Sequence, residues 1–367
     1  MRKLMAVNFI IAFFASSLAM VLPLYLLQMG ISVQDIGLIV SVTPLAFLVL
    51  RSIASVAADV LGTRPFFLAS SASQALSSLA FVFASTPLGF ALGKLLDGSA
   101  QAFFWAVNRT KVLEWERSKE ISLAKLLSVR MLASTIGIGV AGIVISYSFE
   151  SFFQLLALGG LMSLVISLFF WKGRGKREKI DPSTMLDFKH KSRLFKETSF
   201  SILFFAAAFA IFFSFLLPVY LREGMGMPYE EIGALMMFFY ISMAVGSYSA
   251  IEFELDEKVL LFFQDITVPL LLLIPFAPAH MLPLLMLVGF GFGVCYAVQE
   301  KMVVIATKDS GCLSSDVALM FAPATFSEFL VLALSGFVLA FLGSTALFVV
   351  SAALVALFIH DSRDVLK

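Results

Sequence analysis

The sequence has few charged residues, and this shortage excludes two classes of protein. Only 14% of its 367 residues are charged, whereas a typical soluble domain has about 25%. The chain therefore has too little polar surface to cover a water-facing globule. Its formal net charge of +1 provides no basic field that would attract nucleic acid. These values exclude a soluble two-domain enzyme and a nucleic-acid-binding protein.

Cysteine and histidine are also too rare and too scattered to build a metal site or a disulfide framework. Of the two cysteines, Cys295 lies inside an apolar run and Cys312 in a short polar segment. Neither CxxC spacing nor a set of paired bridges is therefore available. The three histidines lie far apart, at His190, His280 and His360. We expect no metal site and no cofactor.

What the chain does have is apolar sequence, which makes up 60% of it and includes 40 phenylalanines. A helix needs about 20 mostly apolar residues to cross the roughly 30 Å hydrocarbon core of a bilayer. Runs of this length are predicted to form twelve spans, at 4–28, 36–58, 65–85, 88–110, 122–146, 151–171, 198–221, 230–251, 258–277, 281–303, 314–340 and 343–360. The sequence predicts an all-α, multi-pass membrane protein. Ten spans are an alternative, because the third and fourth runs and the last two are joined very tightly.

Lysine and arginine are concentrated on one side of the predicted spans. Short cytoplasmic loops are enriched in these residues, and the opposite side carries only Arg222. Both termini are therefore predicted to be cytoplasmic, in a protein of the cell membrane. The basic segment 172–197 would divide the chain into an N-terminal half, 1–171, and a C-terminal half, 198–367. This cytoplasmic linker is expected to be solvated, with anionic membrane lipids as its alternative partner.

The two predicted halves carry matching sequences. LPLYL at 22–26, after the first run, matches LPVYL at 217–221, after the seventh, with an offset of 195 residues. A few residues later, 29–37 matches 225–233 with an offset of 196, so one inserted residue separates the two matches. Parallel repeats of this kind enclose a binding site near the midplane of the membrane.

The segment after the second predicted span carries a recognisable motif. Residues 55–65 read SVAADVLGTRP, in which Asp59, Gly62 and Arg64 match the G-x-x-x-D-x-x-G-x-R motif of the major facilitator superfamily (MFS). In the fourth run, KLLDGSA at 94–100 is similar to that family's R-x-x-q-G-x-g motif. The chain therefore resembles this transporter family over its whole length. The resemblance implies twelve transmembrane helices in two six-helix pseudo-symmetric halves, the MFS fold.

The resemblance also implies that the motif at 55–65 latches a cytoplasmic gate between the halves. Gly62 permits a tight turn, and Arg64 holds the loop at the cytoplasmic face. Asp59 can meet a cation, for which Arg109 is the candidate, or the N-terminus of the eleventh helix. The alternative is a loop that only fixes topology.

Polar residues inside the spans are the best candidates for a substrate or proton pathway. The fourth run carries Lys94, Asp97, Gln101, Trp105 and Asn108, whose spacing of three or four residues places them on one helical face. Lys94 and Asp97 can form an ion pair that a proton or a charged substrate would break. The alternative is a permanent pair that fastens the fourth helix to a neighbour.

The tenth and eleventh runs add three candidates for the same pathway. Tyr296 and Gln299 are the repeat equivalents of Trp105 and Asn108. Glu328 lies about 20 Å from the cytoplasmic end of its helix and could carry a proton, or else be a neutral packing residue. The remaining charged residues are interpreted as interfacial groups that snorkel or pair near the cytoplasmic ends of the helices. They are Arg51, Arg130, Asp265, Glu300 and Lys301.

Together these features predict a secondary active transporter that moves a small organic solute by alternating access. We expect a monomer that is driven by a proton gradient, with efflux as one direction it could take. The sequence contains no P-loop, HExxH or G-x-S-x-G motif, so we do not expect an enzyme. A uniporter is the main alternative, followed by a non-transporting receptor or a membrane-embedded enzyme.

Overall fold

The computed structural model describes residues 2–115, 119–170, 188–253, 256–308 and 313–366. Most of the predicted linker, 172–197, lies outside these ranges, as does Cys312.

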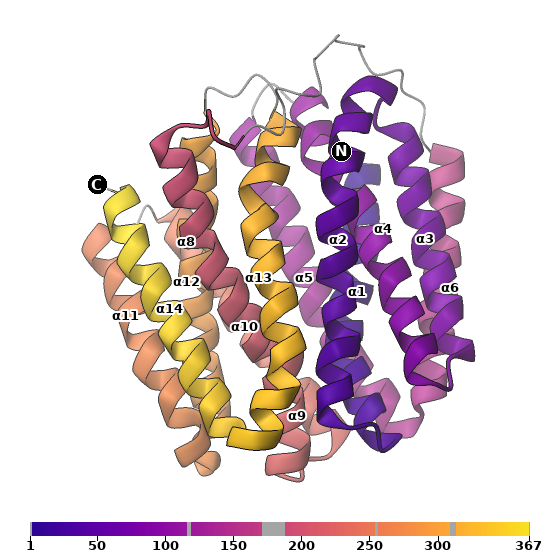
Figure 1. The fold of residues 1–367 in the computed structure, drawn as a ribbon, viewed down its shortest axis with the longest axis vertical. Coiled ribbons are helices and arrows are strands. Elements are labelled where there is room, and N and C mark those ends of the chain that lie inside the picture. The colour runs from indigo at the N-terminus through magenta and orange to yellow at the C-terminus, as the bar shows by residue number, and fades with distance from the viewer. Residues whose placement is uncertain (1, 116–118, 171–187, 254–255, 309–312, 367) are drawn as a thin grey trace.

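Within the described ranges the fold consists of long helices that run side by side across the molecule (Figure 1). The first six helices are α1 Arg2–Gln28, α2 Val33–Leu61, α3 Arg64–Phe83, α4 Pro87–Trp115, α5 Lys119–Tyr147 and α6 Phe149–Phe170. The last six begin with a composite helix, in which α8 Arg193–Phe209 continues into η1 Ala210–Leu216, α9 Leu217–Val219 and η2 Tyr220–Gly224. It is followed by α10 Tyr229–Glu252, α11 Glu257–Leu273, α12 Met281–Ala306, α13 Leu313–Leu342 and α14 Ser344–Leu366, with the short 3₁₀ turns η3 Ile274–Phe276 and η4 Pro278–His280 before α12.

Each predicted span corresponds to one of these helices, so the prediction of twelve is confirmed. The third and fourth runs are separate helices, because the chain turns before Pro87, which begins α4. The last two runs are separate as well. Gly343 turns the chain between them with a φ of 79°, a conformation that glycine adopts without steric cost.

The helices form two groups of six, which are the pseudo-symmetric halves of the predicted fold (Figure 1). The halves meet along two seams, where α2 packs on α13 and α5 packs on α10. Both ends of the chain lie toward one end of the bundle (Figure 1), which we call the terminal face. The other end is the opposite face.

Helix α4 differs from the others in composition. Of the long helices in the described ranges, eleven are long and apolar enough to be candidate membrane spans, and α4 is not among them. Its 29 residues include Lys94, Asp97, Gln101 and Asn108. The helix that carries most of the predicted pathway residues is therefore also the one that is not apolar enough to be a candidate membrane span.

The structure explains the single inserted residue that separates the matching stretches of the two halves. In the C-terminal half the insertion falls in η2, a π-helix that covers Tyr220–Gly224, and a π-helical turn holds more residues than an α-helical turn. Beyond this turn, the N-terminal and C-terminal halves are in register again. Gly30 and Gly226, which match in the repeat, both have positive φ values, of 74° and 66°. The extra residue is thus absorbed without changing the turn that follows.

Two glycine contacts bring the halves together at the opposite face. A Cβ atom added to Gly142 of α5 would lie 2.6 Å from the Cα of Gly233 in α10. A Cβ added to Gly37 of α2 would lie 2.9 Å from the backbone nitrogen of Gly336 in α13. Gly37 and Gly233 are equivalent in the repeat, so both seams use glycine at the same place. Backbone therefore touches backbone, and the opposite face is tightly packed.

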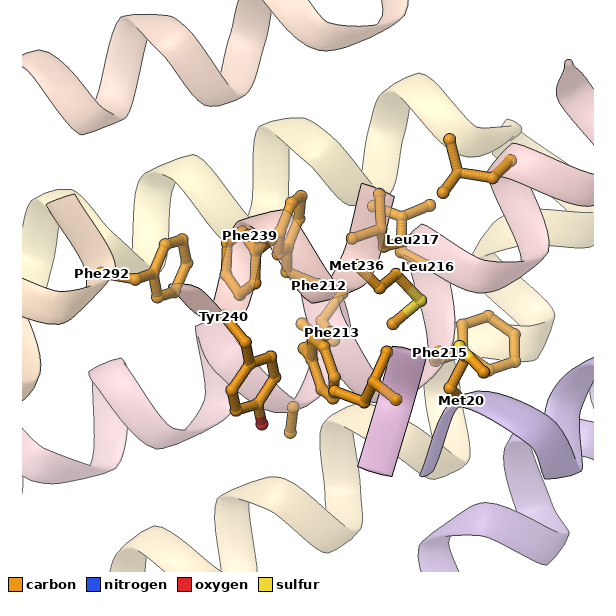
Figure 2. Packing of buried hydrophobic residues seen from close by; sticks show 14 of the residues in the cluster. Met20, Phe212, Phe213, Phe215, Leu216, Leu217, Met236, Phe239, Tyr240 and Phe292 are labelled. Atoms are coloured by element: carbon orange, nitrogen blue, oxygen red, sulfur yellow. The ribbon is translucent and has the colours of Figure 1, made fainter. Parts of the chain in front are cut away.

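Aromatic rings fill the space between the C-terminal helices (Figure 2). Phe212 of η1 stacks on Phe292 of α12 with a centroid distance of 5.6 Å. Phe213 meets the ring of Tyr240 edge to face at 4.8 Å. Such pairs are more favourable than their buried area alone implies. They fix the position of Tyr240, which faces the centre of the molecule.

Candidate functional site

A cavity of about 390 Å³ lies between the two halves. Eight helices line it, four from each half, whereas α3, α6, α11 and α14 contribute no lining residue. The polar and charged lining residues are Ser16, Thr43, Arg51, Gln101, Trp105, Arg130, Ser134, Tyr240, Tyr296, Gln299, Glu300, Thr325 and Glu328. The cavity thus has the size of a small-molecule site and is built from both halves.

The cavity lies in the middle of the bundle and extends toward the terminal face. On α1, for example, the lining residues run from Ile11, in the half of the helix that starts at Arg2, to Ser16 at its middle. On α13 they run from Val317 to Glu328, again in the part nearer to the terminal face. The glycine contacts close the other end of the bundle.

Five of the predicted pathway residues line this cavity. Gln101 and Trp105 project from α4, and Tyr296 and Gln299 project from α12. Glu328 projects from the middle of α13. The helical spacing and the repeat therefore placed these side chains on the correct faces of their helices, while their roles stay predictions.

Lys94 and Asp97, in contrast, are not among the lining residues. Lys94 Nζ lies 3.1 Å from Asp97 Oδ2, and both side chains are buried. The same oxygen accepts hydrogen bonds from Gln101 Nε2 at 3.2 Å and from the Thr43 hydroxyl of α2 at 3.3 Å. Gln101 and Thr43 both line the cavity, so the ion pair lies one layer behind the wall. The geometry favours a pair that fastens α4 to α2.

Asn108, which belongs to the same polar stripe, also has a structural partner. Its side-chain amide exchanges two hydrogen bonds with the amide of Asn8 in α1, at 2.9 and 3.0 Å. Both residues are 1% exposed. The pair satisfies two polar groups at once and connects α1 to α4, away from the cavity.

Three of the residues that the sequence assigns to the interfacial group, Arg51, Arg130 and Glu300, line the cavity. Arg130 lies eleven residues into α5, which begins at Lys119, and is therefore about 16 Å along the helix. The sequence signal that could have revealed Arg130 is a charged residue inside the predicted span 122–146.

The other two residues of this group, Asp265 and Lys301, do not line the cavity. Asp265 of α11 accepts hydrogen bonds from Arg363 Nη2 of α14 at both carboxylate oxygens, at 2.6 and 2.7 Å. Lys301 is exposed near the end of α12.

Arg130 lies against the ring of Trp105, with its guanidinium carbon 4.1 Å from the ring centroid. This is a cation–π contact, which holds a cation at the face of the indole. Nearby, the Ser16 hydroxyl of α1 donates to the Ser134 hydroxyl of α5 at 2.7 Å. Tyr240, from the other half, lies close enough to Arg130 and Ser16 for both to act on its hydroxyl group.

A second arginine lies at the seam between α2 and α13. The Arg51 guanidinium is 5.0 Å from the ring centroid of Phe47 and 5.5 Å from that of Phe321. Its charge acts on the half-buried carboxyl group of Glu328. A positive and a negative side chain from different halves therefore oppose each other across the cavity.

The predicted cytoplasmic gate is only partly within the described structure. Gly62 ends α2 with a φ of 81°, and its amide donates to the Ala58 carbonyl at 2.8 Å, which is the predicted tight turn. Arg64 begins α3 and is exposed. The side chains of Asp59 and Arg109 lie outside the described residues, so the latch stays a prediction.

At the start of the eleventh helix, the structure shows a different contact. Asp316 Oδ1, in the first turn of α13, accepts a hydrogen bond from Lys191 Nζ at 2.6 Å. Lys191 precedes α8, so this ion pair connects the chain that enters the C-terminal half to the start of α13.

Comparisons with known proteins agree with this architecture. A family model described as Major Facilitator Superfamily matches residues 4–304, whereas a comparison with curated protein sequences finds no significant match. Among solved structures, a mutant of the nucleoside transporter NupG aligns with a TM-score of 0.75 and 15% identity, covering 100% of this chain and 99% of that one. A variant of the E. coli fucose:proton symporter FucP gives a TM-score of 0.72 and 14% identity, covering 99% and 98%. At these identities, the likeness to solved structures shows the fold.

Proposed function

This chain belongs to the major facilitator superfamily, and from that premise we propose that it is a secondary active transporter of a small organic solute. One observation carries the proposal. A polar cavity lies in the middle of the bundle, is lined by four helices from each half, and is closed at the opposite face. This geometry suits a site that is exposed to each side of the membrane in turn. Because one chain supplies the whole cavity, we propose that it acts as a monomer.

The transport cycle would open and close the two seams. In the present conformation, α5 and α10 touch at Gly142 and Gly233, and α2 and α13 touch at Gly37 and Gly336. Parting these contacts would open the cavity to the opposite face. The distribution of lysine and arginine indicates that the terminal face is cytoplasmic. On this proposal the structure represents the conformation that faces the cytoplasm.

We propose that a proton drives transport and that Glu328 carries it. Glu328 lines the cavity and lies under the influence of Arg51 from the other half. When its carboxyl group is ionised, Arg51 attracts it across the α2–α13 seam, and protonation removes that attraction. Proton binding would therefore change the force between the halves. Asp97 is less suited to this role because it is buried behind the wall and already paired with Lys94.

A Glu328→Gln variant is expected to lose coupling while it keeps the cavity. The amide cannot exchange a proton at neutral pH, so solute accumulation driven by a pH gradient should fall to the level of simple equilibration. Downhill exchange of the same solute should continue. The measurement is uptake into proteoliposomes with an imposed pH gradient and an internal pH dye, using a panel that includes a nucleoside, fucose and organic anions.

Glu150→Gln is the matched control for this test, since Glu150 is exposed in the first turn of α6, far from the cavity. It should accumulate solute as the wild type does. If Glu328→Gln also accumulates solute at the wild-type rate, Glu328 is not the proton carrier. If the wild type moves solute without moving protons, the protein is a uniporter.

A further inference from the structure

Among the residues that the structure describes, Arg130 is a cavity cation that no carboxylate pairs with. Within the described part of the chain, its guanidinium forms a cation–π contact with Trp105 but no hydrogen bond and no ion pair. The carboxylates among the described lining residues, Glu300 and Glu328, project from α12 and α13, and no ion pair joins either of them to Arg130. An arginine that is partly removed from water without a partner is costly, and a negatively charged ligand would offset that cost.

The contact with Trp105 leaves the binding edge of Arg130 available. A guanidinium held against an aromatic face presents its N–H groups at its rim. That rim matches a carboxylate, which can accept two parallel hydrogen bonds from it. Trp105 therefore serves as a platform that orients the cation and does not neutralise it.

Hydroxyl groups that line the same cavity can support the same anion. Ser134 accepts a hydrogen bond from Ser16 at 2.7 Å, so its own proton remains available for a ligand. Tyr240 also lines the cavity, from the other half. Hydroxyl donors beside an arginine suit an oxyanion.

The rest of this part of the cavity is aromatic. Trp105 from the N-terminal half and Phe205, Phe209, Tyr240 and Tyr296 from the C-terminal half all line it. A volume of about 390 Å³ is at the lower end of the range for small-molecule sites. These walls fit a single-ring solute.

We propose that the transported solute is a small organic anion whose carboxylate binds Arg130 and whose ring lies between the aromatic side chains of the two halves. The inference rests on the proposed transport function and specifies its substrate class. Arg130 belongs to α5 and Tyr240 to α10, so a bound anion would contact both helices of one seam. Arg51 does not serve as the anion site, because Glu328 opposes its charge.

The test uses three probes of nearly identical shape and different charge. Benzoate is an anion, benzamide is neutral and benzamidine is a cation. Purified full-length protein in detergent is heated with each probe, because a ligand that binds the folded state raises the melting temperature. We expect benzoate to raise it in proportion to the logarithm of its concentration, and benzamide and benzamidine to have no such effect.

Variants of Arg130 locate the site. Arg130→Gln should weaken benzoate binding about 10- to 100-fold, which is the loss expected when a charge-assisted hydrogen bond is removed. Arg130→Lys keeps the charge but loses the paired geometry and should lie between Arg130→Gln and the wild type. The matched control is Arg193→Gln, which changes an exposed arginine at the start of α8 and should bind benzoate normally.

Several results would overturn the proposal. Equal stabilisation by benzamide or benzamidine, no stabilisation by benzoate, or normal benzoate binding in Arg130→Gln would each do so. If neither Arg130 variant folds, the charge series on the wild type still decides whether the site selects an anion. Failure here is distinct from failure of the transport proposal. A protein that accumulates neutral or cationic solutes in the proteoliposome assay keeps that function and loses only the assigned substrate class.

Discussion

Replacing Asp97 with asparagine is expected to lower the stability of the folded protein by about 3–5 kcal/mol, the usual cost of removing one partner from a buried ion pair. Asp97 Oδ2 accepts hydrogen bonds from Lys94, Gln101 and Thr43, and the carboxylate is the only negative charge beside the buried Lys94 ammonium group in the described structure. Asparagine would keep the shape of the side chain but leave the charge of Lys94 uncompensated.

The measurement is the thermal unfolding of purified protein in detergent, for the single variant and for a double variant, Lys94→Met with Asp97→Asn. Removing both charges should recover most of the lost stability, because no buried charge is left alone. Glu197→Gln is the control, since it breaks an exposed ion pair with Arg193 and should change stability little. An Asp97→Asn variant as stable as the wild type would show that Lys94 finds another partner.

Replacing Gly142 with alanine is expected to shift the protein away from the conformation described here. The added methyl group would lie 2.6 Å from the Cα of Gly233, and backbone atoms cannot move aside as a flexible side chain can. Overpacking of this kind costs about 1–3 kcal/mol. The equilibrium between the two conformations would then move by about 5- to 150-fold toward the one in which α5 and α10 are apart.

The shift can be measured as a distance across the opposite face. Spin labels on Glu150→Cys and Glu230→Cys, both exposed there, should report a larger fraction of long distances in Gly142→Ala, with the native cysteines replaced. Gly139→Ala is the matched control on the same helix, because its Cβ would meet only the flexible end of Met237. Equal distance distributions in the two variants would mean that the Gly142 contact does not set the closed state. If no variant or condition ever changes the distance, alternating access itself is refuted.

The fold could be predicted from the sequence almost completely, because the bilayer imposes a simple length rule on apolar helices. Even the polar helix α4 was identified, since its apolar residues still form a run of sufficient length. The ends of helices are harder to predict than their apolar centres. α8 begins at Arg193, five residues before the predicted span, because a charged first turn carries no apolar signal.

The cavity was only half predictable, for a physical reason. Helical spacing shows that Lys94, Asp97 and Gln101 share a face, but it does not show which of them a neighbouring helix covers. Thr43 of α2 contacts Asp97 and separates the ion pair from the cavity, whereas the side chain of Gln101 lines the cavity. Arg130 could not be assigned to the cavity from the sequence, because its contact with Trp105 joins α5 to α4. Helical spacing relates residues within one helix and does not predict contacts between two helices.

The composition of α4 also has a consequence for how the protein enters the membrane. A lysine and an aspartate at the centre of an isolated helix each oppose insertion by about 2.5–3.5 kcal/mol, and α4 has both. Helix α3 can offset part of this cost by binding α4, because its Ser70 and Ser77 hydroxyls donate to α4 backbone carbonyls, each at 2.8 Å. A tight turn before Pro87 joins the two helices. We therefore expect α4 to be inserted together with α3 as a hairpin during synthesis, and to be secured only when Thr43 of α2 reaches Asp97.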